Sequence, residues 1–241
     1  MHILDVRIDD MNKKNAIQEV AHLLSLPGQF KIFTPNPEMI VKAQEDEYFK
    51  KVLNTGDLNL CDGMGVRIFT GIERVPGVDF MLELCQLAVE KEKRIYLLGS
   101  GNDEVVYKVY IKLLKRFSLL KIAGYDKGPE IEEPLSAGTQ AQDDSLEKIN
   151  AVKPDILFVA FGMGKQEKWI SENLAKIPSV KIAMGVGGSF DFIAGKAKRA
   201  PLFLRRLGLE WVYRLVQEPR RIGRIFNATF KFVYLYFKSK M

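Results

Sequence analysis

The sequence has few of the residues that serve the commonest kinds of catalysis. Two of its 241 residues are histidines. His2 lies at the extreme N-terminus and His22 falls in an amphipathic helix pattern, which argues against a histidine base and a zinc site. The two cysteines, Cys61 and Cys85, lie in apolar segments without CxxC or metal spacing, and we interpret them as reduced packing residues. A general base in this chain would therefore be a carboxylate.

Long apolar runs are missing as well. The stretches free of charged residues are too short or too broken by polar groups to span a bilayer, and the first residues lack the layout of a signal peptide. We therefore expect a cytoplasmic chain. No Asp-X-Asp triplet ends a predicted strand, so a metal site of that kind is not expected. Hydrophobic residues make up 47% of the chain, enough for a sizeable core.

The net charge of +6 is unevenly distributed. Residues 196–241 contain 12 Lys and Arg against 2 acids, whereas residues 1–195 contain 24 against 28. This tail predicts an anionic partner, with a solvated helix face as the alternative. Aromatic residues lie among its basic residues from Phe226 to Phe237, a composition typical of a segment that lies on an anionic membrane without crossing it. Pro219 and Gly223 are predicted to interrupt helix before that segment.

The first 195 residues alternate helical periodicity with short apolar runs, which predicts an α/β fold with a parallel sheet flanked by helices. Asn36 with Pro37, Asp46 and Asn102 are predicted helix N-caps, and Gly56 is predicted to close a helix. Residues 125–145 are predicted to be a loop, and a basic, aromatic helical appendage is predicted for 196–241. The predicted strands are 31–34, 57–61, 94–98, 119–123, 156–161 and 181–186.

Ligands of an open parallel sheet bind beyond the carboxyl ends of its strands. The segments that follow five predicted strands there are Thr34-Pro35-Asn36-Pro37, Asp62-Gly63, Gly99-Ser100-Gly101, Gly162-Met163-Gly164-Lys165-Gln166 and Gly185-Val186-Gly187-Gly188-Ser189. Three glycine loops favour a nucleotide over tight turning alone. The Gly99 loop departs from a dinucleotide fingerprint at Glu104, which disfavours an NAD-dependent oxidoreductase, and the Gly162 loop is not a Walker loop.

Asp62 stands where a buried strand runs into a turn, a costly place for a charge unless it is satisfied or used. It either accepts a proton as a general base or caps the helix that follows.

Six ordered motifs together resemble the WecG/TagA/CpsF glycosyltransferase family. The motifs are TPNPE (34–38), DGMGV (62–66), ERVPGVD (73–79), GMGKQEKW (162–169), GVGGSFDFIAGKAKRAP (185–201) and LGLEWVYRLVQEPRR (207–221).

The resemblance implies a Rossmann-like catalytic domain (1–195) with a C-terminal appendage (196–241) that completes the site and meets the membrane. It implies a metal-independent, inverting transfer of N-acetylmannosamine or a related sugar from UDP, without a cofactor. The acceptor would be GlcNAc on undecaprenyl diphosphate, in wall teichoic acid or surface polysaccharide synthesis, with a β-1,4 linkage. The chain would be peripheral on the inner face of the cell membrane.

The resemblance also implies roles for single residues. Asp62 would be the base, with Arg74 and Gln166 in the active site. Thr34 and Asn36 would line the sugar pocket. The tail arginines that would bind diphosphate are Arg214, Arg221 and Arg224. The glycine loops add Gly99, Gly101, Gly162 and Gly187 as substrate-binding positions.

Two departures from the family pattern, at Met163-Gly164 and at residues 123–126, leave the donor sugar open. The sequence also does not determine the polymer pathway or whether the chain forms a homo-oligomer. We expect no nucleic-acid partner for the enzyme. The alternative from another class is a non-catalytic nucleotide-binding module whose tail docks on anionic membrane or nucleic acid.

Overall fold

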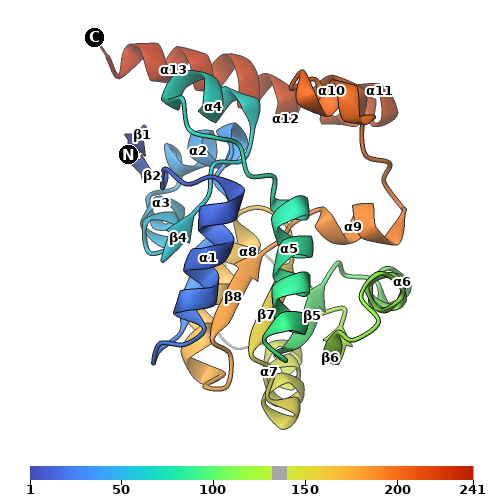
Figure 1. Ribbon diagram of the computed structural model, residues 1–241. Coiled ribbons are helices and arrows are strands. Elements are labelled where there is room, and N and C mark those ends of the chain that lie inside the picture. Colours follow the sequence, from blue (N-terminus) through green and yellow to red (C-terminus); the bar gives the residue numbers. More distant parts are fainter. Residues whose placement is uncertain (132–139, 241) are drawn as a thin grey trace.

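A six-stranded parallel sheet forms the centre of the molecule (Figure 1). The computed structural model describes residues 1–131 and 140–240, without the side chains of residues 140–142, Arg206, Arg214, Arg221, Arg224 and Asn227. Across the sheet the strands are β4 (Leu58–Asn59), β3 (Phe30–Phe33), β8 (Ile182–Gly185), β7 (Ile156–Ala160), β5 (Arg94–Gly99) and β6 (Lys121–Asp126). All six predicted strands are therefore confirmed, and with them the α/β fold.

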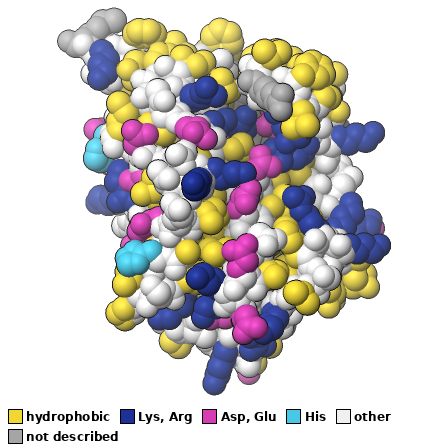
Figure 2. Space-filling model, viewed as in Figure 1, with side chains coloured by type: hydrophobic (Ala, Val, Ile, Leu, Met, Phe, Trp, Pro, Cys, Tyr) yellow, Lys and Arg dark blue, Asp and Glu magenta, His cyan; other side chains and the backbone are white. Residues whose placement is uncertain are grey.

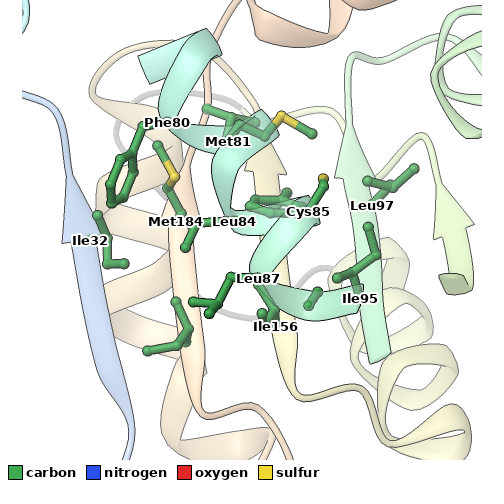
Figure 3. Packing of buried hydrophobic residues seen from close by; sticks show 14 of the residues in the cluster. Ile32, Phe80, Met81, Leu84, Cys85, Leu87, Ile95, Leu97, Ile156 and Met184 are labelled. Atoms are coloured by element: carbon green, nitrogen blue, oxygen red, sulfur yellow. The ribbon is translucent and has the colours of Figure 1, made fainter. Parts of the chain in front are cut away.

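Helices cover both faces of the sheet. The first face carries α1 (Lys13–Leu23), α5 (Gly77–Glu90), α6 (Asp103–Arg116) and α9 (Ser189–Ala194). The second face carries α2 (Pro37–Ala43), α3 (Glu47–Asn54), α7 (Gln140–Val152) and α8 (Lys165–Asn173), which η1 (Leu174–Lys176) continues. Side chains of each strand alternate between the two faces. Ile95 and Leu97 of β5 pack under α5, as Figure 3 shows, whereas Tyr96 and Leu98 belong to the opposite core.

The predicted caps explain where several helices begin. Asn36 Oδ1 accepts the Met39 N–H at 3.0 Å, with Pro37 in the first turn of α2. Asp46 and Asn102 cap α3 and α6 in the same way. Gly56 ends α3 as predicted, because it directly follows the C-cap Thr55 and its N–H donates to the Leu53 carbonyl at 3.1 Å. Gly56 also permits a close approach, since a Cβ there would lie 2.3 Å from Asn59 Oδ1.

Both cysteines are free and buried, and burial raises the pKa of each thiol to about 12. Such thiols are inert at neutral pH. The sequence-based interpretation of Cys61 and Cys85 as packing residues agrees with this environment.

Three local features differ from what the sequence predicted. A hairpin of β1 (His2–Ile3) and β2 (Val6–Arg7) was not predicted, because strands of two residues carry no periodic signal. The predicted loop 125–145 was wrong at both ends, since β6 runs to Asp126 and α7 begins at Gln140; residues 132–139 lie outside the described residues. Gly223 does not interrupt a helix but lies inside α12.

The tail forms a layer of short helices across one end of the molecule (Figure 1). Its elements are α10 (Leu202–Arg206), α11 (Glu210–Gln217), the 3-10 turn η2 (Pro219–Arg221), α12 (Ile222–Phe226), the π-helical turn η3 (Asn227–Lys231) and α13 (Phe232–Lys238). Phe232 is fully buried in the second core, and its ring lies 5.7 Å from that of Phe69 in α4 (Met64–Thr70). The tail is thus packed onto the sheet domain through α4 and α2.

Candidate active site

A cleft of about 630 Å³ lies beyond the carboxyl ends of the strands. Loops that follow all six strands of the sheet contribute to its lining. The sequence-predicted residues that line it are Thr34, Asn36, Asp62, Gly101, Gly162, Gln166 and Gly187. Among the predicted residues whose side chains are described, two are absent from this lining. Gly99 lies against the neighbouring strand, where a Cβ would come within 2.7 Å of the Ala160 backbone, and Arg74 faces a second cavity.

Asp62 is held by one hydrogen bond to each carboxylate oxygen. Arg74 Nε donates to Oδ1 at 3.2 Å, and the Gly77 N–H donates to Oδ2 at 3.2 Å. The helix that follows Asp62, α4, is capped by Gly63 without a side-chain bond, so the alternative that Asp62 caps α4 is wrong. The carboxylate instead faces the N-terminus of α5, whose dipole favours a negative charge. Each oxygen keeps a lone pair for a further donor.

Gly77 makes room for this arrangement. A Cβ at Gly77 would lie 3.1 Å from Thr34 Oγ1 and 3.8 Å from Asp62 Oδ2. The first residue of α5 therefore brings its N–H to Asp62 without crowding Thr34.

Arg74 links Asp62 to the tail. Its Nη2 donates to Glu210 Oε2 of α11 at 3.0 Å. The side chain is 16% exposed. Burial lowers the pKa of Arg74, but the charges of Asp62 and Glu210 outweigh burial and raise it above its usual value. The guanidinium is therefore a fixed positive charge between two carboxylates.

A second cavity of about 320 Å³ lies on the far side of Arg74. Its lining consists of Met64, Arg67, Arg74, Pro76, Asp79, Arg199, Leu202, Arg205 and Glu210. Arg199 pairs with Asp79 through Nη1 and Nη2, and its Nε lies 3.6 Å from Glu210 Oε1. Burial raises the pKa of Asp79, but the Arg199 bond and charge lower it by more. Arg205 Nε is buried without a hydrogen-bond partner in the described part of the chain.

Gln166 reaches the cleft from the first turn of α8. Its Oε1 accepts the Gly187 N–H at 2.8 Å, and its Nε2 donates to Glu167 Oε1 at 2.7 Å. Burial raises the pKa of Glu167 to about 7, against the lowering effect of its hydrogen bonds with Gln166 and Gly164 and of the Lys42 charge.

The side chains of Arg214, Arg221 and Arg224 lie outside the described residues, so their predicted contact with diphosphate stays a prediction. Among residues 1–131 and 140–240, no group of three or more His, Cys, Asp and Glu side chains is placed to hold a metal ion. In the same ranges no helix has the length and apolar character needed to cross a bilayer.

The sequence model of the glycosyl transferase WecG/TagA/CpsF family matches residues 1–241. The chain belongs to the WecG/TagA/CpsF glycosyltransferase family. Three similar relatives are each named an N-acetylglucosaminyldiphosphoundecaprenol N-acetyl-beta-D-mannosaminyltransferase. The Bacillus subtilis relative is 34% identical, over 91% of this chain and 81% of its own length. The relative from Staphylococcus aureus strain MW2 is 29% identical, over 99% of this chain and 92% of its own length. The relative from Bacillus spizizenii is 33% identical, over 87% of this chain and 79% of its own length.

The chain is thus a WecG/TagA/CpsF glycosyltransferase, and several residues of the candidate site were missed by sequence reasoning. Glu210, Arg199 and Arg205 were counted only as part of a charged tail, and Glu167 only as part of a polar first turn. Glu167, Arg199 and Glu210 fall within motifs that carry the family resemblance, and Arg205 does not. Membership of these motifs was the one available sign that the three residues could belong to the site. Their contacts join distant parts of the chain, such as Arg74 with Glu210, and no local pattern encodes such a pair.

Proposed function

We propose that this glycosyltransferase moves N-acetylmannosamine, or a closely related sugar, from UDP to GlcNAc on undecaprenyl diphosphate. The transfer would invert the anomeric centre, form a β-1,4 linkage and serve wall teichoic acid or surface polysaccharide synthesis. The names of the relatives support the substrates. The observation that carries the proposal is the position of Asp62, which lines the cleft and is bonded to an arginine of the second cavity.

The nucleotide sugar would bind in the cleft at the strand ends. Glycine loops line this cleft, and Gly101, Gly162 and Gly187 all have positive φ values that side chains rarely adopt. Such loops let a diphosphate approach the backbone closely. Thr34, Asn36 and Gln166 line the same cleft as Asp62 and would supply polar atoms for the sugar.

The acceptor's diphosphate would bind in the second cavity. Arg67, Arg74, Arg199 and Arg205 line it against two acids, Asp79 and Glu210, so positive charge is in excess. Guanidinium groups match phosphate oxygens with paired N–H donors. Arg205 Nε, which has no hydrogen-bond partner among the described residues, supports an anion there. Arg214, Arg221 and Arg224 would add to this charge.

The proposed chemistry uses Asp62 as a general base. Its carboxylate accepts the proton of the attacking GlcNAc hydroxyl while that oxygen bonds to the anomeric carbon. The bond between the anomeric carbon and the UDP oxygen breaks, and UDP leaves with the electron pair. Cationic side chains and backbone N–H groups stabilise the charge that develops on UDP.

The tail, residues 196–241, would complete the site and hold the enzyme on the inner face of the cell membrane. Figure 2 shows hydrophobic side chains, with Lys and Arg among them, along the upper rim where Figure 1 places the tail helices. Exposed apolar side chains of the tail include Leu202, Phe203, Leu207, Ile222, Phe226, Phe230 and Phe237. Apolar and basic residues together favour binding at an anionic bilayer surface. Residues 1–195 would carry the nucleotide cleft.

A screen of UDP release tests the proposal. Several UDP-sugars are each incubated with the protein and a short-chain prenyl-diphosphate GlcNAc. We expect UDP release that depends on the acceptor and is fastest with UDP-N-acetylmannosamine. Nucleotide binding without release from any donor would contradict the proposal and favour the non-catalytic module.

A further inference from the structure

Glu167 is a fully buried carboxylate beside the cleft. Its side chain does not line the cleft, yet both of its oxygens are occupied: the Gly164 N–H donates to Oε2 at 2.7 Å, and Gln166 Nε2 donates to Oε1 at 2.7 Å. Capping of the first turn of α8 accounts for the bond from Gly164. Helix capping does not account for the bond between Glu167 and Gln166, nor for the burial of Glu167, which is only 1% exposed.

These bonds determine the orientation of the Gln166 amide. On one side the amide meets the Gly187 N–H, a donor, and on the other it meets a carboxylate, which when ionised only accepts. Only one orientation satisfies both neighbours, with Oε1 toward Gly187 and Nε2 toward Glu167. The space is also tight, because a Cβ at Gly185 would lie 2.8 Å from Nε2. One of the two Nε2 hydrogens remains for another acceptor.

We propose that Glu167 is a positioning residue that fixes the Gln166 amide, so that the second N–H of Nε2 is held ready for an acceptor oxygen of the sugar donor. Through this chain of hydrogen bonds Glu167 also joins the Gly164 and Gly187 loops, which follow different strands. The part that concerns the donor rests on the proposed function, whereas the part that concerns the hydrogen-bond chain does not.

The isosteric variant Glu167→Gln tests this role sharply. The wild-type carboxylate offers one acceptor oxygen to the Gly164 N–H and the other to Gln166 Nε2. A glutamine at position 167 keeps only one of these oxygens. Whichever way the two amides turn, one of the three hydrogen bonds from Gly164 to Gly187 is then replaced by two donors that face each other. The double variant Gln166→Glu with Glu167→Gln restores complementary donors and acceptors along the whole chain. It also removes the Nε2 donor from the cleft.

Two measurements are made on the full chain. Hydrogen exchange of the Gly164 and Gly187 amides is followed by NMR without ligand, and kcat and KM for the UDP-sugar are measured with the short-chain acceptor. We expect Glu167→Gln to accelerate exchange of at least one of these amides and to lower kcat/KM about tenfold. In a Gln166→Ala background the same change should lower kcat/KM no further. The double swap should restore slow exchange but not kcat/KM.

Asp46→Asn is the matched control, because Asp46 pairs with Lys168 of α8 but lies outside the cleft lining. It should leave both readouts close to those of the wild type. Unchanged exchange and kcat/KM in Glu167→Gln would overturn the proposal, as would an equal loss of kcat/KM with and without Gln166. If the wild type releases UDP from no donor, the proposed function fails, and amide exchange alone decides the role of Glu167.

Discussion

Arg74 Nε donates a hydrogen bond of 3.2 Å to Oδ1 of Asp62, which joins the carboxylate in the cleft to the guanidinium of the second cavity. The same guanidinium bonds to Glu210 in the tail. The orientation of Asp62 therefore depends on a residue more than 130 positions further along the chain. This contact gives the tail a structural route to the candidate base, in addition to any contact with the acceptor.

Replacing Glu210 tests that route. Glu210→Gln removes the negative charge that pairs with Arg74 at 3.0 Å and with Arg199 at 3.6 Å. We expect turnover to fall about three- to thirtyfold and the free energy of unfolding to fall by about 1–3 kcal/mol, because both arginines are largely buried. Acceptor-dependent UDP release and chemical denaturation measure the two effects. Glu73→Gln, at the exposed neighbour of Arg74, is the control, and equal effects of the two variants would contradict a specific role for Glu210.

Two phenylalanines of the tail separate packing from membrane contact. Phe232 is fully buried against α4, whereas Phe230 is 66% exposed. We expect Phe232→Ala to lower the free energy of unfolding by about 3–5 kcal/mol. Phe230→Ala should change it by about 0.5 kcal/mol or less but weaken binding to anionic vesicles. Calorimetry and vesicle sedimentation check the pair. Vesicle binding that is unaffected by Phe230→Ala would place the membrane contact elsewhere.

The environment of Glu167 predicts a dependence of stability on pH. Burial raises the pKa of Glu167 to about 7 in the folded protein, against an ordinary value of 4.5. Between these values the folded state holds a proton that the unfolded state has lost, so this group's contribution to stability falls as pH rises from about 4.5 to about 7. The decline is about 3 kcal/mol in total.

Denaturation of the wild type and of Glu167→Gln, over pH 4.5 to 8, measures this contribution as the difference between the two proteins. As pH rises from about 4.5 to about 7, the free energy of unfolding of the wild type should fall relative to that of Glu167→Gln. Parallel curves would show that Glu167 does not titrate there.

Metal removal is a further test. We expect EDTA to leave turnover unchanged, since charge on the leaving UDP is assigned to cationic side chains and backbone N–H groups. Loss of activity that Mg²⁺ or Mn²⁺ restores would contradict this assignment.

The sequence was informative about the sheet and about single site residues. The six strands are short apolar runs, so their periodicity is a local property, and the segments after five of them were correctly expected at one edge of the sheet. The segment after β6, which lines the same cleft, was not singled out. The β1–β2 hairpin was not predicted because its turn places Leu4 and Asp5 at positive φ, where glycine or asparagine is usual. Asp62 and Arg74 were both predicted as site residues, but the hydrogen bond between them was not.

Long-range packing explains the remaining gaps. In the sequence Phe232 is one aromatic among many in a basic tail, and only its packing against α4 makes it part of the core. Glu210 and Glu167 likewise gain their importance from contacts with Arg74 and Gln166. Pro219 was interpreted correctly as a break, because its effect on helix is local.

Turnover of Asp62→Asn tests the central claim most directly. Acceptor-dependent UDP release is measured beside UDP-sugar binding and thermal unfolding, since the new amide nitrogen would face one of two donors, the Gly77 N–H or Arg74 Nε. Asp57→Asn, before the amino end of the same strand, is the control. The account predicts that Asp62→Asn lowers kcat by about 10² to 10⁴ while the protein stays folded and still binds the UDP-sugar. A kcat within a few fold of the wild type would contradict Asp62 as the base.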